Sequence, residues 1–280
     1  MFKLRPALVA AAVTVVAVTV VIVVWVAPLR IRSHAAPGTL LFTGDYATGD
    51  FSQWLYMENK DYNGEAAGYR NWGYPASIVH DSDRGYVARY EIRQGDTYGG
   101  AGTERSEVAG DEATTGGTEG QIRWYRFSTK FDATFPQNHA SLGWGVTNQW
   151  HGHGDLTFPS VEWDVNRLNG NWSLMINKQS SPGAYLAIFS IFDVPLGTEW
   201  HDVTMQISWS ASDATGWVRL WHNGVRQTFI GGGDTYFGRT LVPGDPTVYY
   251  KEGYYRKAIE PTGIVYHTGF RCADSEDALQ

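Results

Sequence analysis

The feature that most constrains the fold is an alternation of apolar and polar residues with a period of two. Residues 124–131, 161–166 and 203–209 each follow this pattern. Such alternation is typical of strands that bury one face and expose the other. After Pro37, no stretch of a dozen residues combines a helical apolar period with freedom from Gly and Pro. We therefore predict a domain built almost entirely of strands.

Turn signals separate these segments at short intervals. Asn169-Gly170 and Asn223-Gly224 are examples, and the second predicts a type I′ hairpin after residues 217–222. Many short strands in one domain of this length favour a β-sandwich or jelly roll. We expect the Gly- and Pro-rich residues 231–245 to form a loop over a groove, and residues 273–280 to be frayed.

The N-terminal segment differs in kind from the rest of the chain. Residues 7–27 carry no charged side chain and have basic residues on both sides. As a helix, this run would extend ~30 Å, the thickness of a bilayer core. Residues 33–35 resemble a small-x-small cleavage site, so we favour a cleaved signal peptide over a retained signal anchor. We expect residues 1–35 to direct export, and residues 36–280 to form one domain that is secreted or membrane-anchored outside the cytoplasm.

Composition narrows the function classes. Low charge content and 14% aromatic residues argue against disorder, and a formal charge of −7 argues against a nucleic-acid binder. Without residues 1–35, 18 Lys and Arg residues face 29 acidic residues, which makes the domain −11. The single cysteine, Cys272, excludes a disulfide scaffold. We expect a monomer that contacts a membrane only through its N-terminal segment, and only where that segment is not cleaved.

Three polar clusters lie on strand-like segments. Period two places Gln149 and His151 on one face, with Trp150 directed into the core. It also places Arg105 beside Glu107. Each pair by itself is equally typical of solvated side chains on a sheet.

The third cluster is the aromatic segment of residues 249–256. Tyr249, Lys251, Gly253 and Tyr255 share one face in an extended strand. Gly253 either leaves a notch where a sugar ring approaches the backbone or marks a β-bulge.

Together the clusters supply a guanidinium, an amide, an imidazole, an ammonium and a phenol from separate strands. This set suits β-elimination from a uronate, which needs carboxylate neutralisation, a base for the C5 proton and an acid for the O4 leaving group. Arg105 and Gln149 would stabilise the carboxylate. His151 and Tyr255 would move protons.

The sequence resembles the jelly-roll polysaccharide lyases, a group that includes alginate lyases, heparin lyase I and glucuronan lyases. The resemblance rests on Arg105-Ser106-Glu107-Val108, Gln149-Trp150-His151 and the segment of residues 249–256, and it covers residues 40–272. It implies a concanavalin-like β-jelly roll sandwich of two antiparallel sheets. It also implies an acidic polysaccharide as substrate.

The resemblance implies roles for individual residues. Arg105, Gln149 and His151 would neutralise the uronate carboxylate, and Tyr255, His151 or both would transfer protons. Lys251 matches a lysine expected to contact substrate, and we expect Glu107 and Arg256 to lie in the same substrate-binding set.

Two departures bear on the substrate. Alginate lyases often carry an arginine where this chain has Ala109, and a glutamine where it has Arg256. Both differences favour a glucuronate-containing polymer. In D-glucuronate the C5 proton and O4 lie on the same side, so Tyr255 could perform both transfers, whereas L-guluronate requires His151 as base and Tyr255 as acid.

Other functions stay open at this point. Glu162 and Asp164 share a strand face, as in a β-glucanase-like hydrolase, although Arg167 stands where such enzymes carry a further glutamate. A non-catalytic carbohydrate-binding module would also use the 12 Trp and 16 Tyr residues, but it has no need of a proton-transfer set.

The sequence predicts no required cofactor. His151 and His153 have the spacing of a strand-borne metal-ligand pair, but we interpret His153 as part of a Gly-flanked loop. A structural calcium stays open, because acidic loops such as residues 81–83 could supply oxygen ligands.

The charge of the domain sets a condition on this prediction. A domain at −11 repels a polyanion, so we expect a local positive groove formed by Arg105, Lys251, Arg256 and Lys257.

Overall fold

The computed structural model describes residues 38–66, 68–97, 102–137, 143–154, 157–165, 169–184 and 187–280. The predicted export segment, residues 1–35, lies outside these ranges. No helix in the described part of the chain is long and apolar enough to cross a membrane. Pro37–Gln280 forms one compact unit.

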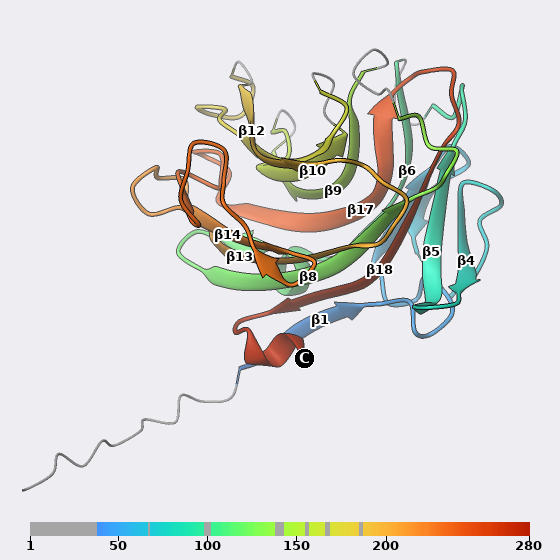
Figure 1. Cartoon of the computed structure of the whole chain (residues 1–280), viewed down its shortest axis with the longest axis horizontal. Helices are drawn as coiled ribbons and strands as arrows, with labels where there is room; N and C mark the ends of the chain where they lie inside the picture. The colour runs from blue at the N-terminus through green and yellow to red at the C-terminus, as the bar shows by residue number, and fades with distance from the viewer. Residues whose placement is uncertain are drawn as a thin grey trace, which may run out of the picture. The chain divides into compact units, whose positions relative to one another are not determined.

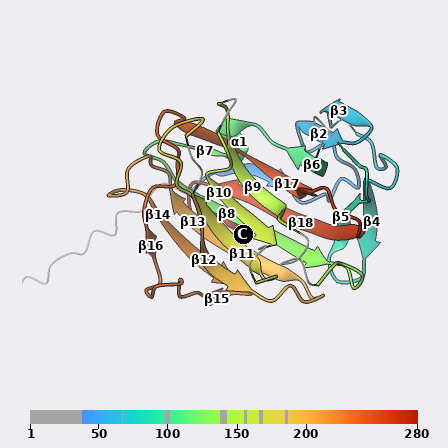
Figure 2. The ribbon, with the colours of Figure 1, turned by 90° about the horizontal axis from the view of Figure 1, so that it is seen from above.

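Two antiparallel sheets pack against each other, which confirms the predicted jelly-roll sandwich (Figures 1 and 2). One sheet, here called the curved sheet, has the order β12-β11-β10-β9-β17-β6-β2-β3, with β7 paired to β17. Its concave side faces away from the second sheet (Figure 1). Its strands are β2 (Tyr56–Asn59), β3 (Tyr62–Glu65), β6 (Thr103–Ala109), β7 (Gly117–Thr118), β9 (Gly145–Gly152), β10 (Val161–Val165), β11 (Trp172–Asn177), β12 (Ile188–Val194) and β17 (Thr247–Lys257).

The second sheet, here called the backing sheet, has the order β15-β14-β13-β8-β18-β5-β4. β1 joins it beside β18, and β16 joins it beside β14. Its strands are β1 (Leu40–Gly44), β4 (Ala76–Asp81), β5 (Gly85–Ile92), β8 (Ile122–Phe131), β13 (His201–Ser208), β14 (Trp217–His222), β15 (Val225–Arg226), β16 (Tyr236–Phe237) and β18 (Gly263–Ala273).

Aromatic side chains fill the space between the sheets. Trp150 and Tyr250 of the curved sheet are fully buried, as are Tyr125 and Phe270 of the backing sheet. The rings of Tyr250 and Phe270 stack with 3.8 Å between centroids and a 5° interplanar angle. Because each of these strands alternates in period two, the residues between the core positions face outward.

The hairpin prediction is confirmed, the loop prediction holds for residues 231–245 except at the two-residue strand β16, and the prediction of a frayed C-terminus is wrong. Asn223 and Gly224 both have positive φ, 51° and 75°, as a type I′ turn requires. Residues 231–245 contain β16, which pairs with β14 at the edge of the backing sheet. The C-terminal residues are not frayed, because they form a 3₁₀ turn (Asp277–Leu279) whose Leu279 packs into a small apolar cluster.

One short helix, α1 (Glu112–Thr115), follows β6. The Asp111 carboxylate caps it by accepting hydrogen bonds from the backbone N–H groups of Ala113 and Thr114. This cap lets the chain turn directly from β6 into β7.

Gly253 occupies a β-bulge in β17. The register between β17 and β9 shifts between Glu252 and Tyr255, and Gly253 has a φ of 145°. A Cβ atom there would lie 2.3 Å from the backbone oxygen of Ser106 on β6. The glycine is therefore required by the close approach of β6, and the bulge interpretation is confirmed over the substrate notch.

Candidate active site

Three neighbouring strands carry the predicted residues onto one surface. β17 lies between β9 and β6 in the curved sheet. Trp150, Tyr250 and Tyr254 face the core, so the alternate positions face the concave side. This arrangement brings together the side chains that we call the β17 site: Arg105, Gln149, His151, Lys251 and Tyr255.

The strand register sets which of these residues are direct neighbours. Tyr255 lies opposite Arg105, and Lys251 lies opposite Gln149. His151 lies opposite Tyr249 instead. The order along β17 is therefore Tyr255 with Arg105 at one end, Lys251 with Gln149 in the middle, and His151 at the other end.

Tyr255 is held between a cation and an aromatic ring. The Arg105 guanidinium carbon lies 4.0 Å from the centroid of the Tyr255 ring. Trp144 contacts the same ring edge-on, with 4.9 Å between centroids and an interplanar angle of 69°. These two contacts hold the Tyr255 ring in a fixed position between the guanidinium and the indole.

Two glutamates orient the two cations. The Arg105 Nη1 atom donates to Glu58 Oε2 at 3.1 Å, and its Nε lies 3.1 Å from Glu107 Oε2. The Lys251 ammonium bonds to Glu58 and lies 3.0 Å from Glu107 Oε2. Glu107 is fully buried and Glu58 is largely buried, so both cations are fixed in direction before any ligand arrives.

These contacts shift the ionisation of the cluster. Burial raises the pKa of Glu58, but Lys251 and Arg105 outweigh it and hold that pKa below its ordinary value. Burial disfavours the charged form of Lys251, but Glu107 and Glu58 keep its pKa above the ordinary value. The same two carboxylates raise the pKa of Arg105 in spite of its burial. Glu58, Lys251 and Arg105 are therefore charged at neutral pH, and the formal charges of the two basic and two acidic side chains in the cluster sum to zero.

Glu107 also fixes the amide of Gln149. The Gln149 Nε2 atom donates to Glu107 Oε1 at 2.5 Å. Its Oε1 atom is buried and has no hydrogen-bond partner among the described residues. Gln149 is 1% exposed, which excludes the alternative of a solvated side chain at this position. Glu107 is a positioning residue, because its buried carboxyl group contacts Arg105, Lys251 and Gln149 and so orients all three.

His151 is poised as a neutral imidazole. Its Nδ1 atom lies 2.6 Å from the Gly152 carbonyl oxygen, which can only accept a hydrogen bond, so Nδ1 carries the proton. Burial, with Lys251 and Arg105 nearby, lowers the pKa of His151 below its ordinary value. The lone pair therefore lies on Nε2 at neutral pH.

Arg256 is not in the site, and the prediction that it contacts substrate is wrong. Its side chain is fully buried on the core side of β17. Its Nε atom donates to Glu104 Oε2 at 2.8 Å, and its Nη1 atom donates to the Pro261 carbonyl oxygen at 2.6 Å. Period two already places residue 256 on the face opposite Tyr255, so alternation alone could have excluded it.

The expected positive groove is also not what the structure shows. Arg256 is buried, and Arg105 and Lys251 are each balanced by Glu58 and Glu107. Lys257 is exposed at the end of β17. The β17 site therefore has no excess of positive charge. Its cations would bind substrate through oriented contacts at short range.

Glu162 and Asp164 line the same face on β10. Glu162 lies opposite Gln149, and both acids are nearly buried. Burial, with Asp164 and Glu107 nearby, raises the pKa of Glu162 well above its ordinary value. Asp164 accepts a hydrogen bond from the backbone N–H of Gly145 at 2.8 Å. The raised pKa favours the uncharged form of Glu162 next to the β17 site, which lessens repulsion of a polyanion.

The histidine pair does not form a metal site in the described part of the chain. His153 Nε2 lies 2.7 Å from Glu112 Oε2, and His151 Nδ1 is bound to Gly152. Among the described residues, no group of three or more His, Cys, Asp or Glu side chains is arranged to hold a metal ion. Residues 81–83 form the acidic loop in which the sequence left a structural calcium site open. There the Asp81 carboxylate accepts a hydrogen bond from Lys130 Nζ at 2.6 Å.

Sequence reasoning missed Glu58 and Trp144. Glu58 lies on β2, which pairs with β6 so that Glu58 is opposite Glu107. A four-residue strand carries too little alternation to place it, and its partners are remote in sequence. Trp144 follows residues 138–142, which lie outside the described ranges, and only the pairing of β9 with β17 brings it to Tyr255.

Comparisons with known proteins agree with this geometry. Residues 46–271 match the family model described as polysaccharide lyase. No curated protein matches the chain. Among solved structures, an endo-β-1,4-glucuronan lyase from the fungus Trichoderma reesei is 18% identical, with a TM-score of 0.61 over 85% of this chain and 96% of its own.

Two alginate lyases share the fold as well. PA1167 from Pseudomonas aeruginosa is 14% identical, with a TM-score of 0.53 over 79% of this chain and 98% of its own. AlyC3 in complex with dimannuronate is 10% identical, with a TM-score of 0.53 over 84% of this chain and 96% of its own. At these identities the structures establish the fold alone. The family match spans most of the sequence, so the chain belongs to the polysaccharide lyase family and is an enzyme of that class.

Proposed function

We propose that this lyase cleaves a glucuronate-containing polysaccharide by β-elimination at the β17 site. The observation that carries the proposal is the convergence of Arg105, Gln149, Lys251 and Tyr255 from β6, β9 and β17 on one concave surface. The family match supports the reaction class, and the sequence departure at Ala109, which lies opposite Lys251, supports glucuronate over alginate.

Arg105 and Gln149 are assigned to the substrate carboxylate. Glu58 and Glu107 occupy part of the donor set of Arg105, but one fifth of its side-chain surface stays exposed toward the concave side. As the C5 proton leaves, negative charge moves onto this carboxylate, and donors that are already oriented stabilise it without reorganisation. Each such donor contributes about 10²–10³ in rate.

Tyr255 is assigned to both proton transfers. The phenolate removes the C5 proton, the electron pair forms the C4–C5 double bond, and the C4–O4 bond breaks. The phenol then returns the proton to O4, so atoms and charge balance and Tyr255 is restored. In D-glucuronate both groups lie on one side of the ring, within reach of one side chain.

The register favours this single-residue route. Tyr255 lies opposite Val146, which is five residues along β9 from His151. At ~3.3 Å per residue this separates the two backbones by roughly 16 Å along the strand. Arg105, in contrast, lies directly opposite Tyr255.

His151 is a second candidate base, favoured by its unprotonated Nε2 atom. It would serve a substrate whose C5 proton lies on the side opposite O4, with Tyr255 as the acid. The effect of His151→Gln on different polymers separates the two routes.

The test is to incubate the purified protein with glucuronan, polymannuronate, polyguluronate and a heparin-type chain, and to follow the ultraviolet absorbance of the unsaturated uronate. We expect the highest kcat/KM on glucuronan. Absorbance from polyguluronate alone would overturn the substrate assignment, and new reducing ends without absorbance would overturn elimination.

We also propose that residues 1–35 direct export, in line with the external location of polymeric uronates. Mass spectrometry of the protein recovered from the culture medium tests this, with a new N-terminus near residue 36 expected. Intact protein retained in the cytoplasm would contradict it.

A further inference from the structure

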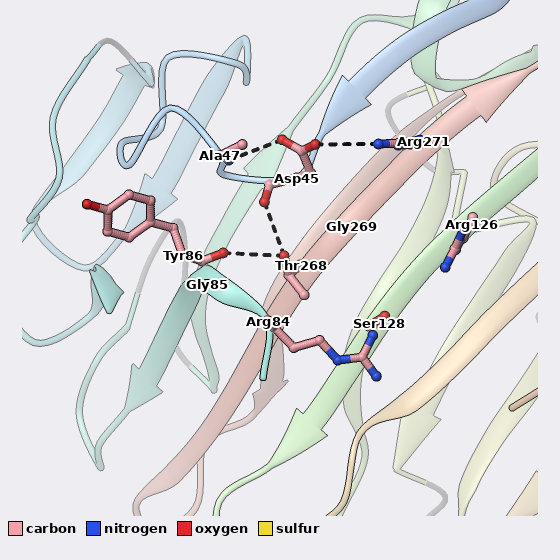
Figure 3. Close-up of a pocket in the computed structure, with 10 residues that line it drawn as sticks. All are labelled: Asp45, Ala47, Arg84, Gly85, Tyr86, Arg126, Ser128, Thr268, Gly269 and Arg271. Atoms are coloured by element: carbon pink, nitrogen blue, oxygen red, sulfur yellow. Dashed lines mark hydrogen bonds and ion pairs between the residues drawn. The ribbon is translucent and has the colours of Figure 1, made fainter. Parts of the chain in front are cut away.

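The backing sheet carries a shallow pocket of about 430 Å³ on its outer face, away from the β17 site (Figure 3). It is centred on β8 and β18, with Arg84 from the loop before β5 and Asp45 from the loop after β1. We call it the arginine pocket. Its lining is Asp45, Ala47, Arg84, Gly85, Tyr86, Arg126, Ser128, Thr268, Gly269 and Arg271.

Small residues keep this pocket open. A Cβ atom at Gly85 would meet nothing within 4 Å, and one at Gly269 would meet only Ser128 Oγ at 3.9 Å. Gly269 has a φ of 70° and lies where the pairing of β18 with β8 shifts register between Thr268 and Arg271. The bulge therefore opens a gap in the row of side chains on β18.

The pocket places two like charges directly opposite each other. Arg271 on β18 is the cross-strand partner of Arg126 on β8. Directly opposite residues on an antiparallel pair have Cβ atoms ~5 Å apart, and like charges there are destabilising. On the other side of Arg126, its neighbour on β13 is the uncharged Thr204.

The carboxylates near the pocket are already engaged. Asp202 pairs with Arg84 at 2.9 Å and accepts from Ser128 Oγ at 2.6 Å. Asp45 accepts from Gln53 Nε2 at 2.9 Å and from the backbone N–H of Ala47 at 3.1 Å, and lies 3.9 Å from Arg271. Arg126 is exposed, makes no hydrogen bond or ion pair with the described residues, and interacts with Asp202 only at longer range, whereas Arg271 Nη1 donates to the Leu279 carbonyl oxygen at 3.2 Å. The Arg126 guanidinium thus has its full set of donors available, in a domain whose net charge is −11.

We propose that the arginine pocket is a second, non-catalytic binding site for a carboxylate-bearing sugar residue of the acidic polymer. A guanidinium binds a carboxylate through two parallel N–H donors, and an anion between Arg126 and Arg271 removes their mutual repulsion. The volume is within the range of small-ligand sites. The identity of the polymer rests on the proposed function, while the preference for a carboxylate rests on the pocket alone.

The consequence is a two-point attachment. One segment of a polymer occupies the concave face while another segment, or another chain, is held on the outer face of the backing sheet. Such a second contact raises the local concentration of long substrate without altering the chemistry.

The test uses the full chain carrying Tyr255→Phe, which we expect not to cleave, and a saturated glucuronate oligosaccharide as the probe. Side-chain Nε–H signals of arginine are followed by NMR during titration, and the signals of Arg126 and Arg271 are identified by their loss in Arg126→Gln and Arg271→Gln. We expect both signals to shift with one dissociation constant. In Arg126→Gln, the constant measured on Arg271 should weaken about tenfold. Arg126→Lys should weaken it less, because the charge remains and the paired donors are lost.

Arg226→Gln is the matched control. Arg226 lies on β15 of the same sheet and pairs with Asp234 at 3.3 Å, so its loss changes net charge equally without touching the pocket. We expect this variant to bind as its parent does, and a neutral β-glucan oligosaccharide of equal length to shift neither signal. Equal weakening in Arg226→Gln and Arg126→Gln would overturn the proposal, since binding would then follow net charge. Shifts with inorganic phosphate but not with the glucuronate probe would also overturn it.

Failure of this proposal and failure of the proposed function give different results. If the wild-type protein eliminates no polyuronate while the Arg126 signal shifts with the probe, the binding site is supported and the proposed function is rejected. If elimination occurs and the Arg126 signal does not shift, the binding site is rejected and the proposed function is supported.

Discussion

The β17 site and the arginine pocket both present arginine on a sheet surface, but they treat its charge in opposite ways. In the β17 site, Arg105 and Lys251 are bracketed by Glu58 and Glu107, and the four charges cancel. In the arginine pocket, Arg126 faces another arginine and is exposed to solvent.

This difference in charge compensation fits two different tasks, stabilising a reaction and holding a ligand. A group that must stabilise charge developing during a reaction gains from being fixed in direction, even where a neighbouring carboxylate weakens its attraction for the resting substrate. A group that only holds a ligand gains from free donors. The four predictions below test this contrast, in order of decreasing effect.

The largest effect is expected for Tyr255→Phe. Removal of the phenol removes both the base and the acid, so the rate of unsaturated-product formation should fall about 10⁴-fold. Thermal unfolding should be unchanged, because Tyr255 is half-buried and its ring contacts remain. A rate within tenfold of wild type would remove Tyr255 from the mechanism.

Glu107→Gln should have the next largest effect. This substitution replaces a carboxylate that Arg105 and Lys251 share with a neutral amide. We therefore expect the free energy of unfolding in urea to fall by about 3 kcal/mol, and kcat to fall strongly as well. Glu58→Gln is the matched control: Glu58 pairs with the same two cations but keeps some exposure, and should cost about 1 kcal/mol. Equal losses in both variants would show that burial of Glu107 is not what orients the cluster.

A smaller effect is expected from the titration of His151. Burial and nearby cations lower the pKa of His151, so any step that uses Nε2 as base is lost as the pH falls through a pKa lower than that of an ordinary histidine. On polyguluronate, kcat/KM should show this acidic limb and His151→Gln should remove most activity. On glucuronan, His151→Gln should cost about tenfold or less. An identical loss on both polymers would contradict the single-residue route.

The smallest effect concerns the stability of the two arginines. Arg105→Gln removes partners of Glu58 and Glu107 and should cost about 2 kcal/mol. Arg126→Gln removes a repulsion and no ion pair, so the free energy of unfolding should change by less than about 0.5 kcal/mol or rise slightly. Chemical denaturation of both variants under one buffer measures the contrast, and a clear destabilisation by Arg126→Gln would show that its charge is compensated in the free protein.

The sequence by itself determined the fold class, the type I′ hairpin and which side chains share the strand faces of the β17 site, because all three depend on local properties. Alternation with period two sorts side chains between two faces, and this was enough to place Arg105 beside Glu107 and Gln149 beside His151. The same rule, applied one residue further, would have removed Arg256 from the substrate-binding set.

Only the tertiary structure decided where the charges are compensated. Glu58 reaches Arg105 and Lys251 because β2 pairs with β6, and Arg126 faces Arg271 because β18 pairs with β8. Strand pairing joins segments that are far apart in sequence, and no local pattern records which partner strand a residue will face. A single sequence can therefore indicate a lyase and suggest candidate reacting groups. It cannot show that one set of cations is neutralised in place while another is left open on the opposite sheet.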